Sequence, residues 1–150
     1  MNALLWDKSP AISPAGRVPC GTETILVVED ESAVRNFIVS KLENCGYTVF
    51  AAAHGYDALL EVKSHPRIID LLLTDVMMKW KNGIRTAEEV KAMQPDIKIL
   101  FISGFTEEPT VRQAIKSGAF FLAKPFTPIE LAWRVREVLD QTEQSGALSA

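Results

Sequence analysis

The chain has few of the residues that build disulfide frameworks or zinc sites. Its 150 residues include two cysteines, Cys20 and Cys45, and two histidines, His54 and His65. The cysteines do not form a CxxC pair, so we expect no structural zinc site. Two cysteines in a chain of this length suit a reducing compartment better than a disulfide scaffold.

Long apolar runs and an excess of positive charge are also missing. No apolar stretch approaches the roughly 18 residues that a membrane span requires. The first residues lack the basic-then-apolar order of a secretory signal, so a cytoplasmic location is expected. The net charge of −3 argues against sequence-independent binding of nucleic acid, which needs many Lys and Arg residues.

The chain divides into three segments by composition. Residues 1–21 contain three prolines and no sustained periodicity, which is typical of a flexible leader. Residues 22–141 alternate between apolar runs and helical patterns, and we expect them to form one domain. Residues 142–150 are expected to be a flexible tail.

Five apolar runs each precede a helical pattern. Strands are expected at 24–30, 47–52, 68–75, 97–103 and 119–124, and helices at 31–46, 55–65, 84–94, 107–118 and 127–141. This (βα)5 order predicts an α/β fold with a doubly wound, five-stranded parallel sheet and helices on both faces. The second run alternates most and should be an edge strand. Thr127 is the expected N-cap of the last helix, with Pro128 at its first position.

Four of the five predicted strands end in a residue able to do chemistry. Glu29 and Asp30 end the first, Asp75 the third, Ser103 the fourth and Lys124 the fifth. Parallel strands bring their carboxyl ends to one edge, where doubly wound sheets bind ligands. We therefore expect these five side chains to converge.

This set of residues suits phosphoryl transfer beside a metal ion. Three carboxylates repel one another unless a cation shares the site, and oxygen ligands favour Mg²⁺. Asp75 would then be the nucleophile, with Lys124 and Ser103 holding phosphate oxygens. Each residue alone has a simpler explanation: a helix N-terminal charge cluster, a turn residue or a surface lysine. Their joint placement at successive strand ends favours function.

The same motifs resemble the receiver domain of bacterial two-component response regulators. The similarity covers Thr22 to Gln141 and rests on "ILVVEDE", "LLLTDVMM" followed by Gly83, "ILFISG" and "FLAKPF". Gly83 stands eight residues after Asp75, as the family expects. The resemblance implies the flavodoxin-like strand order 2-1-3-4-5.

The resemblance also implies a role for each site residue. In such proteins a histidine kinase or phosphotransfer protein passes a phosphoryl group to the aspartate that corresponds to Asp75. The implied roles are Mg²⁺ ligation by Glu29, Asp30, Asp75 and the Met77 backbone carbonyl, catalysis by Asp75, Lys124 and Ser103, switching by Ser103 and Phe121, and a cis peptide bond before Pro125.

Two features depart from the family pattern. Lys79 stands where the family usually has proline, four residues after the phosphoacceptor, and Trp80 and Lys81 follow it. These residues bear on the loop conformation and on the lifetime of the phosphoryl group. The stretch from Gly118 to Lys124 is one residue shorter than in many stand-alone receivers, which is similar to receivers fused to hybrid histidine kinases.

The leading hypothesis is a phosphoacceptor switch or relay protein that is not itself an enzyme. Nine residues follow Gln141, too few for a DNA-binding module, so we expect output through a protein partner. The surface of the fourth helix, fifth strand and fifth helix, with Trp133, Arg134 and Arg136, is the candidate for that partner or for a homodimer. A core Trp133 and a solvated basic face are an equally good explanation of these residues.

Other classes of function stay open or are disfavoured. The chain could be the receiver segment of a hybrid histidine kinase, or a pseudo-receiver that binds partners without phosphorylation. The intact acidic set counts against the pseudo-receiver. A dehalogenase-like phosphatase would place its nucleophile in a DxD pattern after the first strand, and a nicotinamide-binding domain would carry GxGxxG there. Residues 29–34 instead read "EDESAV".

Overall fold

The computed structural model describes residues 18–65, 68–78, 82–104 and 109–141. Its strands are β1 (Thr24–Val28), β2 (Thr48–Ala52), β3 (Leu71–Asp75), β4 (Lys98–Ser103) and β5 (Phe120–Ala123). Its helices are α2 (Ser32–Asn44), α3 (Gly55–Ser64), α4 (Gly83–Met93), α5 (Pro109–Lys116) and α6 (Pro128–Leu139). Within these ranges no helix has the length and apolar character needed to cross a membrane.

The five strands form one parallel sheet in the order β2-β1-β3-β4-β5, as predicted. The central pair is β1 and β3, with Val28 opposite Thr74. The alternating second strand, β2, lies at the edge, which confirms that expectation. The strand order reverses between β1 and β3, so the crevice beyond their carboxyl ends is where such a sheet binds ligands.

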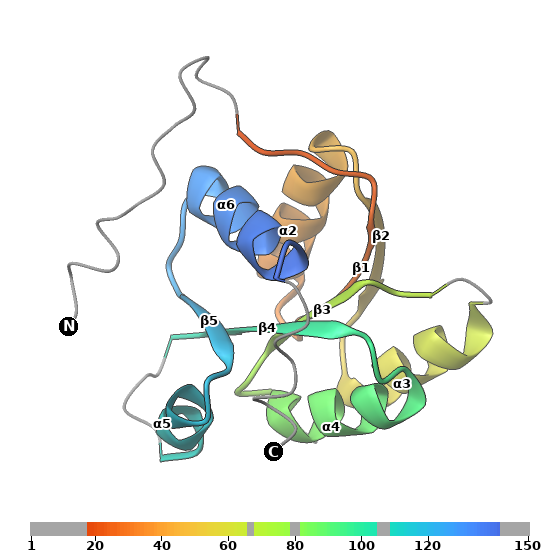
Figure 1. Ribbon diagram of the computed structural model, residues 1–150, viewed down its shortest axis with the longest axis vertical. Coiled ribbons are helices and arrows are strands. Elements are labelled where there is room, and N and C mark those ends of the chain that lie inside the picture. The colour runs from red at the N-terminus through yellow and green to blue at the C-terminus, as the bar shows by residue number, and fades with distance from the viewer. Residues whose placement is uncertain (1–17, 66–67, 79–81, 105–108, 142–150) are drawn as a thin grey trace.

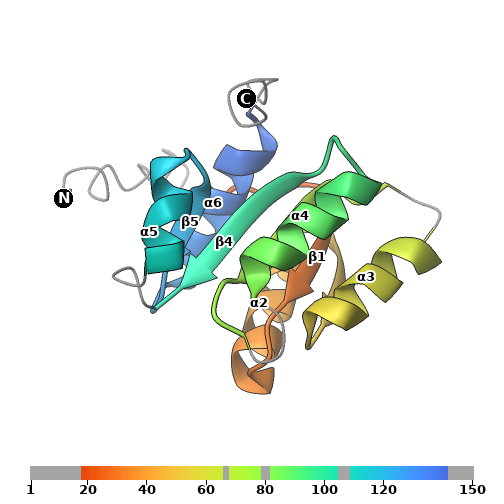
Figure 2. The ribbon, with the colours of Figure 1, turned by 90° about the horizontal axis from the view of Figure 1, so that it is seen from below.

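Helices cover both faces of the sheet (Figure 1). One core cluster joins Ile25 and Leu71 to residues of α2 and α6, and the other joins Leu26 and Leu72 to residues of α3, α4 and α5. Figure 2 shows α3, α4 and α5 side by side over that second face. Successive residues of β1 and β3 enter opposite clusters because side chains alternate along a strand. β1 and β3 are therefore mostly apolar, and their polar residues Thr24, Thr74 and Asp75 stand at or next to a strand end.

The ends of the helices follow the local sequence signals. Thr127 caps α6 with its side chain, which accepts a hydrogen bond from the Glu130 backbone nitrogen at 3.1 Å. The Glu130 carboxylate accepts one from the Thr127 nitrogen at 2.9 Å, which completes a capping box. The predicted N-cap is thus confirmed. The predicted start of the fourth helix at residue 107 lies outside the described residues, and α5 is described from Pro109.

Residues 18–21, which the composition assigned to the leader, contact the domain. The Arg136 guanidinium of α6 donates to the Cys20 carbonyl at 3.1 Å and to Glu23 Oε2 at 2.6 Å. It also contacts the Tyr47 hydroxyl at 3.2 Å and Asp140 at 2.9 Å. Arg136 is therefore engaged in holding the start of β1, rather than being free on the partner surface suggested by the sequence.

This Arg136–Glu23 pair predicts a pH-dependent contribution to stability. Hydrogen bonding to Arg136 lowers the pKa of Glu23 below its ordinary 4.5, against an opposing effect of burial. The contribution is present above pH 4.5 and is lost as pH falls through the lowered pKa of the folded protein. We expect Glu23→Gln to reduce the free energy of unfolding at pH 7 by about 1 kcal/mol.

Urea unfolding of both proteins from pH 7 to pH 3 measures this difference. Glu43→Gln is the control, because Glu43 is exposed and its substitution removes the same charge. A Glu23→Gln deficit that persists undiminished at pH 3 would contradict the ion pair as its source.

Candidate metal and phosphoryl-transfer site

The two central strands place the acidic residues. β1 ends at Val28, so Glu29 and Asp30 follow it directly, and Asp75 is the last residue of β3. Because β1 and β3 pair side by side and in parallel, their carboxyl ends lie at the same edge of the sheet. The predicted convergence of these three side chains is present in the structure.

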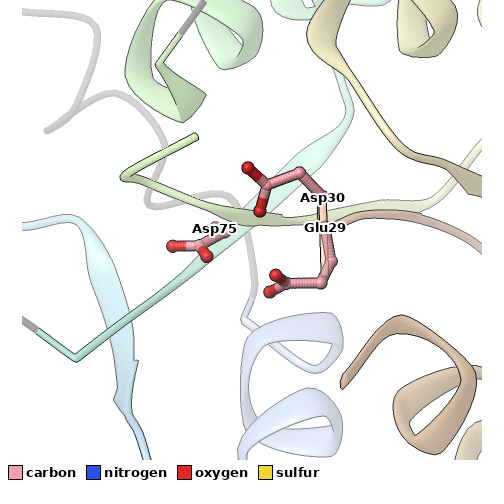
Figure 3. A group of neighbouring side chains, drawn as sticks. All are labelled: Glu29, Asp30 and Asp75. Carbon is pink, nitrogen blue, oxygen red and sulfur yellow. The ribbon is translucent and has the colours of Figure 1, made fainter. Parts of the chain in front are cut away.

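Glu29, Asp30 and Asp75 form a compact acidic cluster (Figure 3). Each offers a carboxylate oxygen, and these oxygens lie within 4.8 Å of one another. Glu29 is 1% exposed and Asp75 is 5% exposed, whereas Asp30 is half-buried. Two of the three charges are therefore removed from water, which is costly unless cations compensate them.

Lys124, from the end of β5, supplies one positive charge that partly compensates these carboxylates. It follows β5, and its Nζ lies 2.9 Å from Asp75 Oδ2 and 3.1 Å from Glu29 Oε1. Burial alone would lower the pKa of Lys124, but the hydrogen bond and charge of Asp75, together with Glu29, raise it above its ordinary value. Lys124 is thus held as a cation. Three carboxylates and one ammonium leave a formal charge of −3 + 1 = −2.

Glu29 shows that this compensation is incomplete. Burial raises the pKa of Glu29 to about 7; the Glu31 backbone N–H and Lys124 oppose the rise, and Asp75 adds to it. Glu29 Oε1 makes no hydrogen bond to any described residue, since Lys124 is near but outside hydrogen-bonding geometry. A buried carboxylate oxygen without a donor, in a site of charge −2, fits a divalent cation with oxygen ligands.

The other predicted site residues lie around the cluster. Ser103 is buried at the end of β4, and its backbone carbonyl accepts a hydrogen bond from the Lys124 backbone nitrogen at 3.0 Å. The Met77 nitrogen donates to Asp75 Oδ1 at 3.1 Å. Phe121 packs against Phe101 with ring centroids 5.3 Å apart. Ligation by the Met77 carbonyl and switching by Ser103 and Phe121 remain predictions.

Gly83 is required by close backbone packing after β3. A Cβ at this position would overlap the Asp75 carbonyl group, and the Gly83 nitrogen donates to the Val76 carbonyl at 2.8 Å. The fixed spacing from Asp75 to Gly83 therefore has a steric cause. The peptide bond between Lys124 and Pro125 is cis, as the resemblance implied. Lys79, Trp80 and Lys81 lie outside the described residues.

Arg35 is a site residue that the sequence reasoning missed. Its guanidinium Nη1 donates to the Glu29 backbone carbonyl at 2.7 Å, and the Glu31 nitrogen donates to Glu29 Oε2 at 3.1 Å. These bonds fix the turn that carries Glu29 and Asp30. An arginine in the first turns of the helix that follows an acidic pair is the signal that could have indicated it.

The raised pKa of Glu29 predicts how stability depends on pH in the metal-free protein. Glu29 binds its proton more tightly when folded, so its ionisation costs stability as pH rises from 4.5 to about 7. Glu29→Gln removes that cost. In the presence of a chelator, its stability relative to wild type should increase by roughly 2–3 kcal/mol from pH 4.5 to pH 8.

Urea unfolding at several pH values tests this expectation. Glu31→Gln is the matched control, because it removes the charge of an exposed carboxylate two residues away on the same turn. If the free energies of unfolding of Glu29→Gln and wild type differ by the same amount at every pH, ionisation of Glu29 does not destabilise the folded protein, which would contradict the prediction.

Comparison with known proteins identifies the family of domains to which this chain is similar. The sequence profile of the family described as "Response regulator receiver domain" matches residues 25–136. The chain is 38% identical over 124 residues to the sensor kinase CckA of Brucella abortus, which is 82% of this chain and 13% of that protein. It is 36% identical over 128 residues to the transcriptional regulatory protein ZraR of Salmonella typhimurium, covering 85% of this chain and 29% of ZraR.

Solved structures agree with the fold. The CheY-like receiver domain protein of Methanospirillum hungatei JF-1 is 25% identical with a TM-score of 0.73, over 84% of this chain and all of that one (100%). The receiver domain of the hybrid histidine kinase CckA is 34% identical with a TM-score of 0.67, over 78% of this chain and 99% of that one. The chain thus spans a small part of the full-length CckA and ZraR proteins but nearly all of a receiver domain. With its flavodoxin-like sheet and its acidic cluster, this chain belongs to the response regulator receiver domain family of two-component signalling.

Proposed function

We propose that Asp75 accepts a phosphoryl group from a histidine kinase or a phosphotransfer protein. The observation that carries this proposal is the contact of Lys124 with both Asp75 and Glu29 at the carboxyl edge of the sheet. An Asp75 oxygen would attack phosphorus as the bond to the donor's imidazole nitrogen breaks, and the imidazole leaves with that electron pair. The Lys124 ammonium is placed to balance charge on the transferred group.

Glu29, Asp30 and Asp75 would hold Mg²⁺, with the Met77 backbone carbonyl as a further ligand. The bound cation would neutralise negative charge on the phosphoryl group and on the carboxylates. Glu29 and Asp30 reach the site on a turn that the Arg35 and Glu31 donors fix, so they would be preorganised for it. Ser103 and Phe121 are the proposed switch residues, because both lie on strands that end at the same edge.

The proposed output surface consists of α5, β5 and α6. Ile115 of α5 is 44% exposed and Ile129 of α6 is 42% exposed, and both are apolar side chains available to a partner. The Trp133 indole N–H is buried without an acceptor among the described residues. A second candidate function is that of a receiver segment working with a hybrid histidine kinase, which the similarity to CckA favours.

Phosphorylation by a small donor tests the assignment of Asp75. After incubation with Mg²⁺ and acetyl phosphate, the intact protein should gain about 80 Da, the mass of one phosphoryl group. Asp75→Asn should gain none. Asp96→Asn removes an exposed carboxylate from the same domain and should be modified as wild type is.

Two outcomes would overturn the proposal. One is that wild type gains no mass when Mg²⁺ and donor are both present. The other is that Asp75→Asn gains as much as Asp96→Asn does, which would place the phosphoryl group on a different residue.

A further inference from the structure

Two Cys-Gly dipeptides lie side by side at the amino-terminal edge of the sheet. The Gly21 nitrogen, directly after Cys20, donates to the Cys45 carbonyl at 3.1 Å. A Cβ on Gly46, directly after Cys45, would lie 2.6 Å from the Gly21 carbonyl oxygen. The segment before β1 and the turn after α2 therefore meet backbone to backbone. This contact is at the edge opposite the acidic cluster, because Thr24 begins β1 whereas Glu29 follows its end.

Both glycines are needed for this close approach. Gly46 has a φ of 99°, a conformation that side chains disfavour, and it ends α2. A Cβ on Gly21 would meet the Arg136 guanidinium and Glu23, and would lie 2.6 Å from Tyr47 Cε1. Arg136 also binds the Cys20 carbonyl at 3.1 Å. The backbone on both sides of the Cys20 side chain is thus held in place.

Cys20 and Cys45 each directly precede one of the two glycines of this backbone contact. Both cysteines are free; Cys20 is exposed and Cys45 is half-buried against the core that α2 and α6 cover. Burial raises the pKa of the Cys45 thiol, and the charge and hydrogen bonding of the Cys20 thiol raise it further. This agrees with the 3.1 Å hydrogen bond from the Gly21 nitrogen to the Cys45 carbonyl, which holds the two cysteines near each other. Cys20, being exposed, is the one that an outside reagent meets first.

We propose that Cys20 and Cys45 form a reversible disulfide that fastens the segment before β1 to the end of α2. The oxidant is a low-molecular-weight disulfide such as oxidised glutathione. The Cys20 thiolate attacks one of its sulfurs and releases the first glutathione thiol. The Cys45 thiolate then attacks the Cys20 sulfur of the mixed disulfide and releases the second. One small disulfide is reduced to two thiols, which take up the two protons, while the two protein thiols are oxidised.

The bond closes a covalent loop from residue 20 to residue 45. That loop contains β1, the Glu29–Asp30 pair and α2. Closing a loop of this length restricts the unfolded chain, so the oxidised protein should melt roughly 5–10 °C higher than the reduced protein. The inference does not depend on phosphorylation of Asp75, since the two sites lie at opposite edges of the sheet.

Equilibration in glutathione redox buffers tests the proposal. Folded protein should lose both free thiols and about 2 Da, with no glutathione retained. Half-oxidation should occur at a buffer at least roughly tenfold more reducing than the one required for the same protein unfolded in urea, because the fold holds the thiols together. Equal midpoints, a retained glutathione adduct or a disulfide between two chains would overturn it.

A displaced pair supplies the matched control. Ser40→Cys with Cys45→Ser keeps two thiols, but moves one to an exposed position more than one helical turn away. This double variant should stop at mixed disulfides with glutathione. The rise in melting temperature should be reversed by dithiothreitol and absent from Cys20→Ser and from Cys45→Ser. Intramolecular oxidation of the displaced pair at the wild-type midpoint would contradict a specific pairing.

Discussion

Lys124 makes the contact on which the site depends. Its ammonium group lies between Asp75 and Glu29, so one side chain from the end of β5 connects the carboxyl ends of β3 and β1. The order of the strands makes this reach necessary, because β4 lies between β3 and β5. Without this cation two buried carboxylates would stand beside each other uncompensated. With Lys124 included, the site keeps a formal charge of −2, which is the basis for the proposed divalent cation and the proposed phosphoryl transfer.

Much of the fold could be predicted because its signals are local and repeated. The apolar runs at β1 and β3 are buried along their length and the run at β4 is buried over its last four residues. Thr127 caps α6 as its sequence indicates. The convergence of Glu29, Asp75 and Lys124 followed from topology alone, since parallel strands end at one edge. The strand order itself came from the family resemblance, because periodicity does not say which strands are neighbours.

The features that were missed depend on contacts between distant segments. Arg35 reaches back to the Glu29 backbone carbonyl. Its position early in the helix after the acidic pair is a signal, but a backbone acceptor has no residue type that would identify it in the sequence. Arg136 resembled a surface cation in its helical pattern, yet it holds Glu23 from 113 residues away. From the sequence, Cys20 and Cys45 were expected to be two reduced thiols. In the structure, the glycines that follow them lie in backbone contact. Composition could not have distinguished this arrangement from two separate cysteines.

Asp75, Lys124 and the acidic pair form the proposed phosphoryl-binding site. Beryllofluoride, which resembles a phosphoryl group on a carboxylate, tests this site at equilibrium and without a donor protein. Bound resonances should appear in the ¹⁹F NMR spectrum of the full chain when Mg²⁺ is present. They should disappear when Mg²⁺ is chelated, and should be missing from Asp75→Asn. Bound resonances that persist in Asp75→Asn, or that form equally well without Mg²⁺, would contradict it.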